Sequence, residues 1–508
     1  MDALDLARWQ FAITTVYHFF FVPITIGMSA LVAGLHTAYL RTRNPEYLRL
    51  SKFFGKLFVI NFALGLVTGI VQEFQFGMNW SSYSRFVGDI FGAPLAFEAL
   101  LAFFMESTFL GLWIFGWGRI PEKLHNACIW LVHIGTVLSA YFILAANSFM
   151  QHPVGYRLNA QTGRAEMADF VAVLLNKVQL VTFPHVVAGA YMVGGAMVMS
   201  VALYKMRQAH AGAATEPERR LHEGRDFDIR EDVPMWRKAV RLGAITTLVA
   251  GLAVAITGDI QGKIMTEVQP MKMAAAEALY DTPPDGECAN FSVLTVGKLD
   301  GSDAKNIIEI PCLLSFLGTG SFSGKIHGIN EIERDYRAAF ADGGDKAVMI
   351  KDLSGKETNY TAAPTYVPNI PMSYWNFRLM IGAGLFAAAV AAWALFALRG
   401  GRVPTAGWVK PVLILTPLAT VLAHSFGWIF TEVGRQPWAV FGTMVTSTGV
   451  SPSVSTTDVW ISMIVYTLLY GALAVVEVKL FLDYIRRGAE PYEPVARVAD
   501  EDQLAFSY

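Results

Sequence analysis

The sequence has few charged residues for its length. Of its 508 residues only 16% are charged, whereas 54% are hydrophobic and Phe alone occurs 34 times. A soluble globular chain carries about a quarter of its residues as charged side chains. A nucleic-acid-binding protein would have a strongly basic balance, and the formal net charge here is −2. The composition excludes both classes and indicates a membrane protein.

Long apolar runs take the place of the missing charge. A helix needs about 20 apolar residues to cross the hydrocarbon core of a bilayer. The first run begins too late and continues too far to be a cleaved signal peptide, and no internal repeat of solenoid period is present. We expect an all-α polytopic membrane protein with about nine spans, at 10–39, 54–72, 94–117, 125–149, 180–204, 238–257, 375–398, 409–430 and 457–483.

The basic residues predict the orientation of these spans. Loops after the odd-numbered spans are rich in Lys and Arg, and the short loops after the even-numbered spans carry far fewer. By the positive-inside rule the N-terminus is outside and the C-terminus is cytoplasmic. We therefore divide the chain into spans one to six at 1–258, with an exposed, charged cytoplasmic connector at 205–237, an extracytoplasmic loop at 259–373, and the remaining spans and cytoplasmic tail at 374–508.

The loop at 259–373 is much longer than the other connections, and loops of this length are usually functional or disordered. Cysteine is scarce, with three residues in the chain, but Cys288 and Cys312 both lie in this loop. Disulfides persist outside the cytoplasm, so we expect these two to be bonded. Cys128 lies near the start of the fourth span, where it is interpreted as a small apolar residue.

Four residues near the outer ends of the spans are potential axial haem ligands: His18, His185, Met380 and Glu432. Taken singly, each has an ordinary interpretation as a packed or interfacial side chain. The combination at similar depth indicates haem, because His with Met holds a low-spin haem and a lone His or carboxylate leaves a position open for O2. For the other histidines of the spans we prefer a structural role; these are His36, His125, His133 and His424.

Two carboxyl groups lie inside the third span. Glu98 and Glu106 are about 12 Å apart along the helix axis and about 80° apart around it. Their placement suits stations for proton transfer, which Ser107 and Ser139 would extend, and the alternative is neutral carboxyls hydrogen-bonded within the bundle. Two arginines stand beside the ligand candidates. Arg378 and Arg435 would pair with haem propionates or act as interfacial anchors.

These motifs resemble subunit I of the cytochrome bd family of quinol oxidases, over nearly the whole membrane part. The most specific stretches are "VYHFFFVPITIG" at 16–27, "GDIFGAPLAFEALLAFFMESTFLGLWIFGW" at 88–117, "VQPMKMAAAEALY" at 268–280 and "GRQPW" at 434–438. The resemblance implies that His185 and Met380 hold haem b558, and that His18 and Glu432 hold haems b595 and d. Which of the two holds haem d stays open, with His18 preferred.

The resemblance also implies roles for the other candidates. Glu98 and Glu106 match the family's proton route, Arg378 and Arg435 its haem-neighbouring arginines, and Trp428 an aromatic residue between haems. Lys272 and Glu277 match a pair implicated in quinol binding. The loop at 259–373 matches the Q loop, although it is shorter after Glu277 than in long-loop members.

The activity implied is oxidation of ubiquinol or menaquinol at the outer face of the bacterial cytoplasmic membrane, with reduction of O2 to water. Protons taken from the cytoplasm would generate a proton motive force without a separate pump. Expected partners are a second membrane subunit and small single-helix subunits, and nucleic acid is not expected.

Other classes fit the residues less well. A proton-coupled transporter would usually show repeated halves and broken helices. A haem–copper oxidase would need adjacent histidines, which the chain lacks. The cytochrome b subunit of a quinone-linked dehydrogenase would carry only low-spin haem.

Overall fold

The structure is a computed structural model that describes residues 2–159, 161–225, 227–351 and 357–494. Within these residues, nine helical segments are long and apolar enough to cross a membrane. They are α1 (Ala3–Thr42), α2 (Pro45–Met78), α3 (Ser81–Phe97) continued by η1 (Glu98–Phe103) and α4 (Phe104–Phe115), α5 (Glu122–Gln151), α6 (Phe170–Leu174) with α7 (Lys177–His210), η2 (Ile229–Asp232) with α9 (Val233–Val268), α13 (Ile370–Ala397), α14 (Val409–Val433) and α15 (Thr456–Arg487).

The expected fold class is confirmed, and the main difference lies in helix length. α1 begins at Ala3 and α9 continues to Val268, well beyond the spans expected from the apolar runs alone. Polar residues extend these helices because a helix satisfies its own backbone hydrogen bonds beyond the hydrocarbon core as well as inside it. The long loop therefore begins after Val268, and the division expected at residues 258 and 259 falls inside α9.

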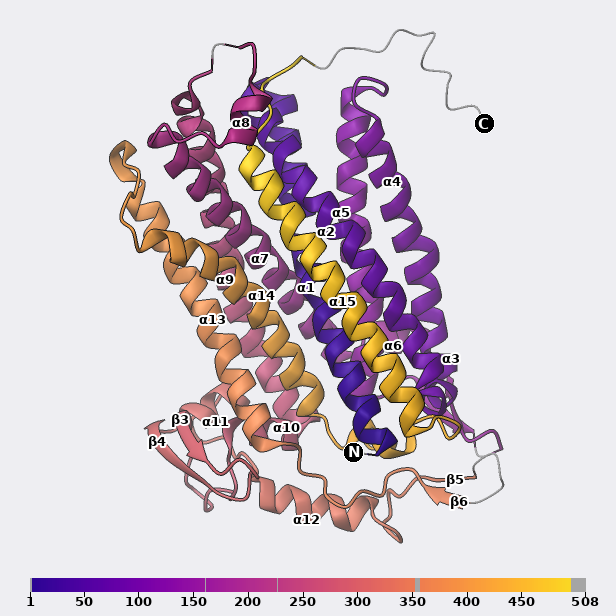
Figure 1. The fold of residues 1–508 in the computed structure, drawn as a ribbon. Helices are drawn as coiled ribbons and strands as arrows, with labels where there is room; N and C mark the ends of the chain where they lie inside the picture. Colours follow the sequence, from indigo (N-terminus) through magenta and orange to yellow (C-terminus); the bar gives the residue numbers. More distant parts are fainter. Residues whose placement is uncertain (1, 160, 226, 352–356, 495–508) are drawn as a thin grey trace, which may run out of the picture.

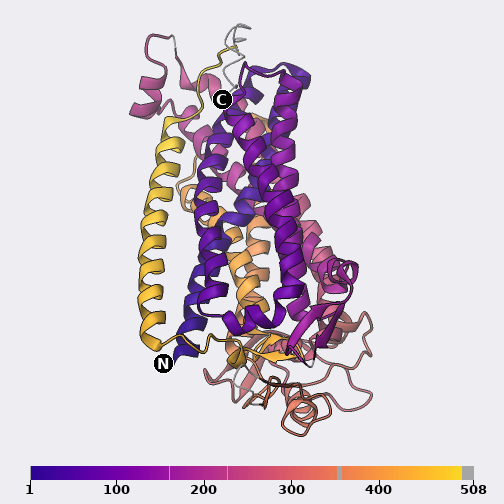
Figure 2. The same ribbon diagram turned by 90° about the vertical axis from the view of Figure 1, so that its right-hand side faces the viewer.

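The helices run side by side, with the long loop gathered at one end of the bundle, below called the loop end (Figure 1). The N-terminal end of α1 also lies there, and α8 (Glu216–Leu221) lies at the opposite end. α15 crosses in front of the bundle in Figure 1 and stands at its left edge in Figure 2, so it lies on the outside of the bundle. Only 11% of the 18 most apolar consecutive residues of α15 are buried within this chain. Most of the helix is therefore available to lipid or to another subunit.

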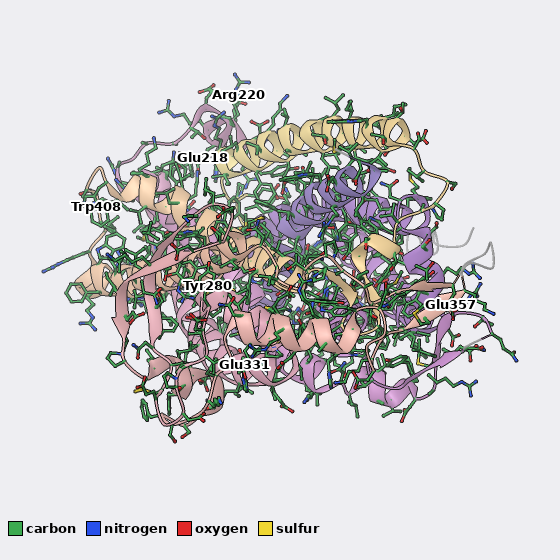
Figure 3. All side chains as sticks on the ribbon, turned by 90° about the horizontal axis from the view of Figure 1, so that it is seen from below. Glu218, Arg220, Tyr280, Glu331, Glu357 and Trp408 are labelled. Atoms are coloured by element: carbon green, nitrogen blue, oxygen red, sulfur yellow. A yellow bond between two sulfur atoms is a disulfide. The ribbon has the colours of Figure 1, made fainter. Side chains whose placement is uncertain are left out.

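The long loop is folded, and Figure 3 shows its end of the molecule with Tyr280 and Glu331 labelled. It contains α10 (Pro270–Glu277), α11 (Leu313–Thr319) and α12 (Ile329–Phe340), the antiparallel pair β3 (Phe291–Gly297) and β4 (Ala304–Ile310), and the short pair β5 (Met349–Lys351) and β6 (Glu357–Asn359). Outside this loop lie β1 (Tyr156–Asn159) with β2 (Arg164–Met167), β7 (Trp438–Val440) with β8 (Met444–Val445), and the short turns η3 (Arg399–Gly401) and η4 (Thr446–Thr448).

The charged connector is mostly exposed, as predicted, but it is shorter than expected and partly fixed to the bundle. Residues 205–210 belong to α7 and residues 233–237 to α9, which leaves a shorter connection. Within it Glu218 is buried and pairs with Lys205 at 2.9 Å, and Asp232 pairs with Arg49 of α2 at 2.5 Å. Ion pairs with little exposure to water fix the connector against the bundle, because an unpaired charge there would be costly.

Candidate functional site

Contacts along α14 show where the predicted haem ligands lie. Met380 of α13 packs against Gly427, where a Cβ atom would approach its sulfur to 2.9 Å. Phe19, next to His18, packs edge-on against Trp428 with ring centroids 5.0 Å apart. His185 lies one turn closer to the loop end than Gly189, which faces His424. His18, His185 and Met380 are therefore all near the level of residues 427–428, about one turn deeper than Glu432.

Each of the two histidines has a threonine hydroxyl beside its Nδ1 atom. His18 Nδ1 lies 2.9 Å from Oγ1 of Thr68 in α2, and His185 Nδ1 lies 3.1 Å from Oγ1 of Thr257 in α9. Sequence reasoning did not select these threonines, because a Thr in an apolar helix is normally a packing residue. The bonds occupy Nδ1, so Nε2 is the nitrogen that each ring presents for a metal.

Glu432 is held on both sides. Its Oε1 accepts a hydrogen bond from Asn147 of α5 at 2.9 Å, and its Oε2 pairs with Arg435. Arg435 is buried and also donates to the carbonyls of Trp438, at 3.0 Å, and Ala439. The carboxylate is thus fixed at the end of α14. Asn147 was not predicted, although an amide in the apolar part of the fourth span was a signal in the sequence.

The donor set fits a macrocycle-bound iron better than a bare metal ion. Across the described residues no group of three or more His, Cys, Asp and Glu side chains could hold a metal ion. Haem iron takes four ligands from its own ring and needs one or two from the protein, which these separate His, Met and Glu side chains can supply. Arg435 Nε is buried without a hydrogen-bond partner in the same described parts, so a donor remains for an anionic group.

Arg378 lies close to the long loop as well as to Met380. Its guanidinium pairs with Glu277 at 2.6 Å, donates to the Ser292 carbonyl at 2.6 Å and stacks over Tyr374. The sequence suggested a propionate or the membrane interface as its partner, whereas the structure pairs it with the second residue of the expected quinol pair. Arg378 thus joins the loop to the helix that carries Met380.

Lys272 and Glu277 belong to the segment expected as a long extracytoplasmic loop, but their side chains are buried. Both lie on α10, and only 2% and 4% of their surfaces are exposed. Lys272 donates to the side chain of Gln151, an unpredicted residue one turn beyond Asn147 on α5. Burial lowers the pKa of Lys272 to about 7 and raises the pKa of Glu277 to about 7, with Arg378 acting against the rise. Both groups can therefore change charge near neutral pH.

The two carboxyls of the third span are more nearly aligned than an ideal helix predicts. Residues 98–103 form one wide π-helical turn, which adds a residue and reduces the expected angle from about 80° to about 20°. Glu98 accepts a hydrogen bond from Ser139 of α5 at 2.7 Å, and Glu106 packs on Gly135, one turn away. Glu106 Oε1 is buried without a hydrogen-bond partner in the described residues. Both carboxyls therefore face α5.

Ser107 does not join this pair. Its hydroxyl donates to the carbonyl of Phe103 in its own helix at 2.9 Å, and the residue is exposed.

Three of the histidines expected to be structural have ring nitrogens within hydrogen-bonding distance of a neighbour. His36 is close to Trp113, His125 to the Trp113 carbonyl, and His133 to Ser29 and Tyr191. His424 differs, since its Nε2 is buried and unpaired in the part of the chain described.

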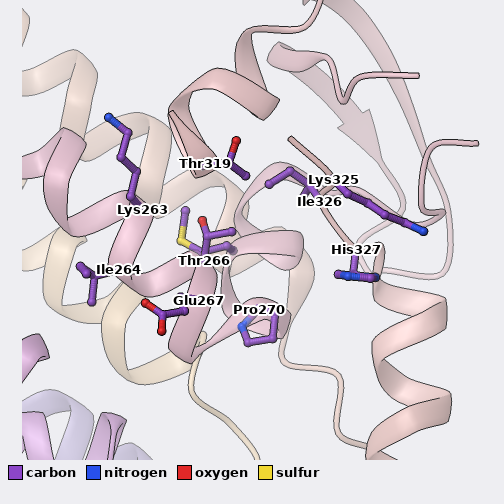
Figure 4. A pocket seen from close by; sticks show the side chains of 11 residues that line it. Lys263, Ile264, Thr266, Glu267, Pro270, Thr319, Lys325, Ile326 and His327 are labelled. Carbon is purple, nitrogen blue, oxygen red and sulfur yellow. The ribbon is translucent and has the colours of Figure 1, made fainter. Parts of the chain in front are cut away.

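A cavity of about 400 Å³ lies where the long loop meets the end of α9 (Figure 4). Its lining includes Lys263 and Glu267 of α9, Pro270 and Met273 of α10, and His327 of the loop. Lys272 and Glu277 do not line it, because their side chains are buried elsewhere around α10.

The expected disulfide of the long loop is present: Cys288 and Cys312 are bonded, with Cα atoms 5.0 Å apart. Cys128 is buried and free.

Comparison with known proteins gives one family. The family model for "Cytochrome bd terminal oxidase subunit I" matches residues 6–489. The cytochrome bd ubiquinol oxidase subunit 1 of Bacillus subtilis (strain 168) is 41% identical over 96% of this chain and 95% of its own. The cytochrome bd-II ubiquinol oxidase subunit 1 of Escherichia coli (strain K12) is 34% identical over 96% of this chain and 97% of its own.

A solved structure agrees with this result. The bd oxidase from Geobacillus thermodenitrificans superposes with a TM-score of 0.77 and 26% identity, covering 96% of this chain and 99% of that one. The chain therefore belongs to the cytochrome bd terminal oxidase subunit I family, whose members are subunits of membrane-bound quinol oxidases.

Proposed function

We propose that this subunit binds three haems: b558 between His185 and Met380, and b595 and d at His18 and Glu432, with His18 preferred for haem d and the reverse assignment open. The placement of His18, His185 and Met380 near one level of α14, with Glu432 a turn away, supports this most directly. Bound there, the haems would supply electron transfer and the reduction of O2 to water. Trp428 would lie between them, since it contacts the residue after His18 and is one turn from Glu432.

Quinol would be oxidised at α10, with ubiquinol or menaquinol as the donor. Glu277 would accept a quinol proton, because its pKa of about 7 allows it to be ionised and then protonated near neutral pH. Arg378 would hold the Glu277 carboxylate in position, and Lys272 would orient the head group or balance its charge. The cavity between α9, α10 and the loop offers an approach to this helix.

Protons for water would move along the face that α3 and α4 present to α5. Along α5, Glu106 packs on Gly135 and Glu98 bonds to Ser139, which is one turn closer to Asn147, the partner of Glu432. Glu106 is therefore the deeper of the two carboxyls. If the loop end is extracytoplasmic, as the basic loops predict, a proton passes from Glu106 to Glu98 while travelling outward. Charge separation would follow from this route without a pump.

The assembly would contain a second membrane subunit in the bacterial cytoplasmic membrane, with small single-helix subunits possible, and the N-terminus and long loop outside. The test is a reduced-minus-oxidised visible spectrum of the purified complex, with and without carbon monoxide, for wild type and His18→Ala. We expect b-type bands and a red-shifted chlorin band that responds to carbon monoxide and is lost or altered in His18→Ala. A complex without haem would contradict the proposal.

A further inference from the structure

The two predicted histidine ligands lie against the same dipeptide in two different helices. His18 of α1 faces Thr68 and Gly69 of α2. His185 of α7 faces Thr257 and Gly258 of α9. In each case the threonine hydroxyl meets Nδ1 and the following glycine meets the ring.

Each threonine hydroxyl also reaches a carbonyl of its own helix. Thr68 Oγ1 donates to the carbonyl of Gly65 at 2.9 Å, and Thr257 Oγ1 donates to the carbonyl of Ala253 at 2.7 Å. A hydroxyl has one hydrogen, and a helix carbonyl can only accept. When that hydrogen is donated to the carbonyl, the threonine oxygen accepts from the histidine. A neutral ring that binds iron through Nε2 requires this arrangement, because its proton is then on Nδ1.

The glycines allow the rings to come this close. A Cβ atom at position 69 would lie 3.2 Å from Cε1 of His18, and one at position 258 would lie 3.1 Å from Cε1 of His185. Both values are below an ordinary van der Waals contact of about 3.5 Å or more. A larger residue would move the imidazole away from the threonine.

We propose that Thr68 and Thr257 are positioning residues that fix the Nδ1–H tautomer of His18 and His185 and so direct Nε2 of each ring to its haem iron. The inference rests on the haem sites of the proposed function. A ligating histidine whose other nitrogen donates a hydrogen bond is oriented and made more basic, and loss of such a partner typically costs about 10-fold to 100-fold in metal affinity.

The experiment uses the complete oxidase complex in detergent, with the variants Thr68→Val, Thr68→Ser, Thr257→Val and Thr257→Ser. Valine keeps the shape and removes the acceptor, whereas serine keeps the hydroxyl. Thr247→Val is the matched control, because Thr247 is buried in α9 and donates to the carbonyl four residues earlier, at 2.9 Å, without contacting a histidine. The readouts are haem content, the iron–histidine stretching band of the reduced high-spin haem, and the midpoint potential of the low-spin haem.

We expect Thr68→Val to lower the frequency of the iron–histidine band and Thr257→Val to raise the low-spin midpoint potential, because the unbonded imidazole donates less charge to iron. Each valine variant should also lose haem on dilution more readily, whereas the serine variants and Thr247→Val keep the wild-type values. Unchanged bands in both valine variants, in a complex that contains haem, would overturn the inference and leave the proposed function intact. If the valine variants do not assemble, shifted bands in the serine variants would overturn it. A wild-type complex without haem would instead contradict both this inference and the proposed function.

Discussion

The loop end of the bundle and the helix formed by α3, η1 and α4 hold carboxyl groups in different ways. At the loop end Glu277 pairs with Arg378, and Glu432 pairs with Arg435. In the α3–α4 helix Glu98 accepts a hydrogen bond from Ser139, and Glu106 has an unpaired oxygen; neither forms a salt bridge in the described parts of the chain.

The difference is physical. An arginine beside a carboxylate favours the ionised form and fixes its position. In an apolar helix without a cation the neutral form of a carboxyl is favoured, and the charged form is short-lived. The first arrangement suits groups that must keep one position, such as a metal ligand or a base fixed beside its substrate. The second suits groups that pass a proton on.

The largest effect is expected from breaking an arginine pair. Arg378→Met leaves Glu277 buried without a cation, which in other proteins costs about 3–5 kcal/mol. We expect the complex to unfold at a clearly lower temperature and to lose quinol oxidation. Haem absorbance measured during heating monitors the unfolding. The double variant Arg378→Met with Glu277→Leu should regain most of the stability but no activity. Equal instability of both variants would show that the pairing itself is unimportant.

A large loss of turnover, with little loss of stability, is expected from Glu106→Gln. The amide keeps the shape and cannot carry the proton, so O2 consumption should fall by about 100-fold, within the range of general acid–base catalysis. Visible spectra should not change. Ser107→Ala is the control, because this hydroxyl bonds only to its own helix. Wild-type turnover in Glu106→Gln would exclude this carboxyl from the proton route.

A moderate effect is expected from pH. Glu277 accepts a proton only when it is ionised, and burial raises its pKa to about 7. The rate of quinol oxidation under saturating O2 should therefore rise as pH increases through about 7, with close to a tenfold change per unit on the acid side.

Lys272 loses its charge in the same range, since burial lowers its pKa to about 7, so the two residues must be separated. Glu277→Gln should abolish the rise with pH, and Lys272→Met should leave it in place. If the pH profile of quinol oxidation is flat in Lys272→Met and unchanged in Glu277→Gln, the pH dependence belongs to Lys272 instead of Glu277.

The smallest effect is expected from the disulfide of the long loop. The bond joins cysteines 24 positions apart, and closing a loop of this size contributes about 3 kcal/mol in the chain-entropy account. The double variant Cys288→Ser with Cys312→Ser should keep its haem spectrum and most of its activity at 25 °C, while the loop becomes more sensitive to protease. Wild type treated with reductant should behave alike, and abolished quinol oxidation in both would give the bond a larger role.

Features carried by short stretches were predictable from the sequence. The nine spans were found because twenty apolar residues in a row have one stable arrangement in a bilayer. The pairing of Cys288 with Cys312 could be expected because the chain has only one other cysteine, inside a span.

Features that depend on a neighbouring helix were not predictable. The burial of Lys272 and Glu277 depends on α10 folding back onto the bundle, where Gln151 and Arg378 meet them. The alignment of Glu98 with Glu106 depends on a wide turn whose sequence, EALLAF, is ordinary for a helix.

The sequence by itself determined the membrane class, the number of spans and the residue types available for haem, protons and quinol, because hydrophobicity and side-chain chemistry are local properties. The tertiary structure decided which of these side chains meet. Thr68 reaches His18 across 50 positions of sequence and Arg378 reaches Glu277 across 101, and only packing of the helices brings such residues within hydrogen-bonding distance.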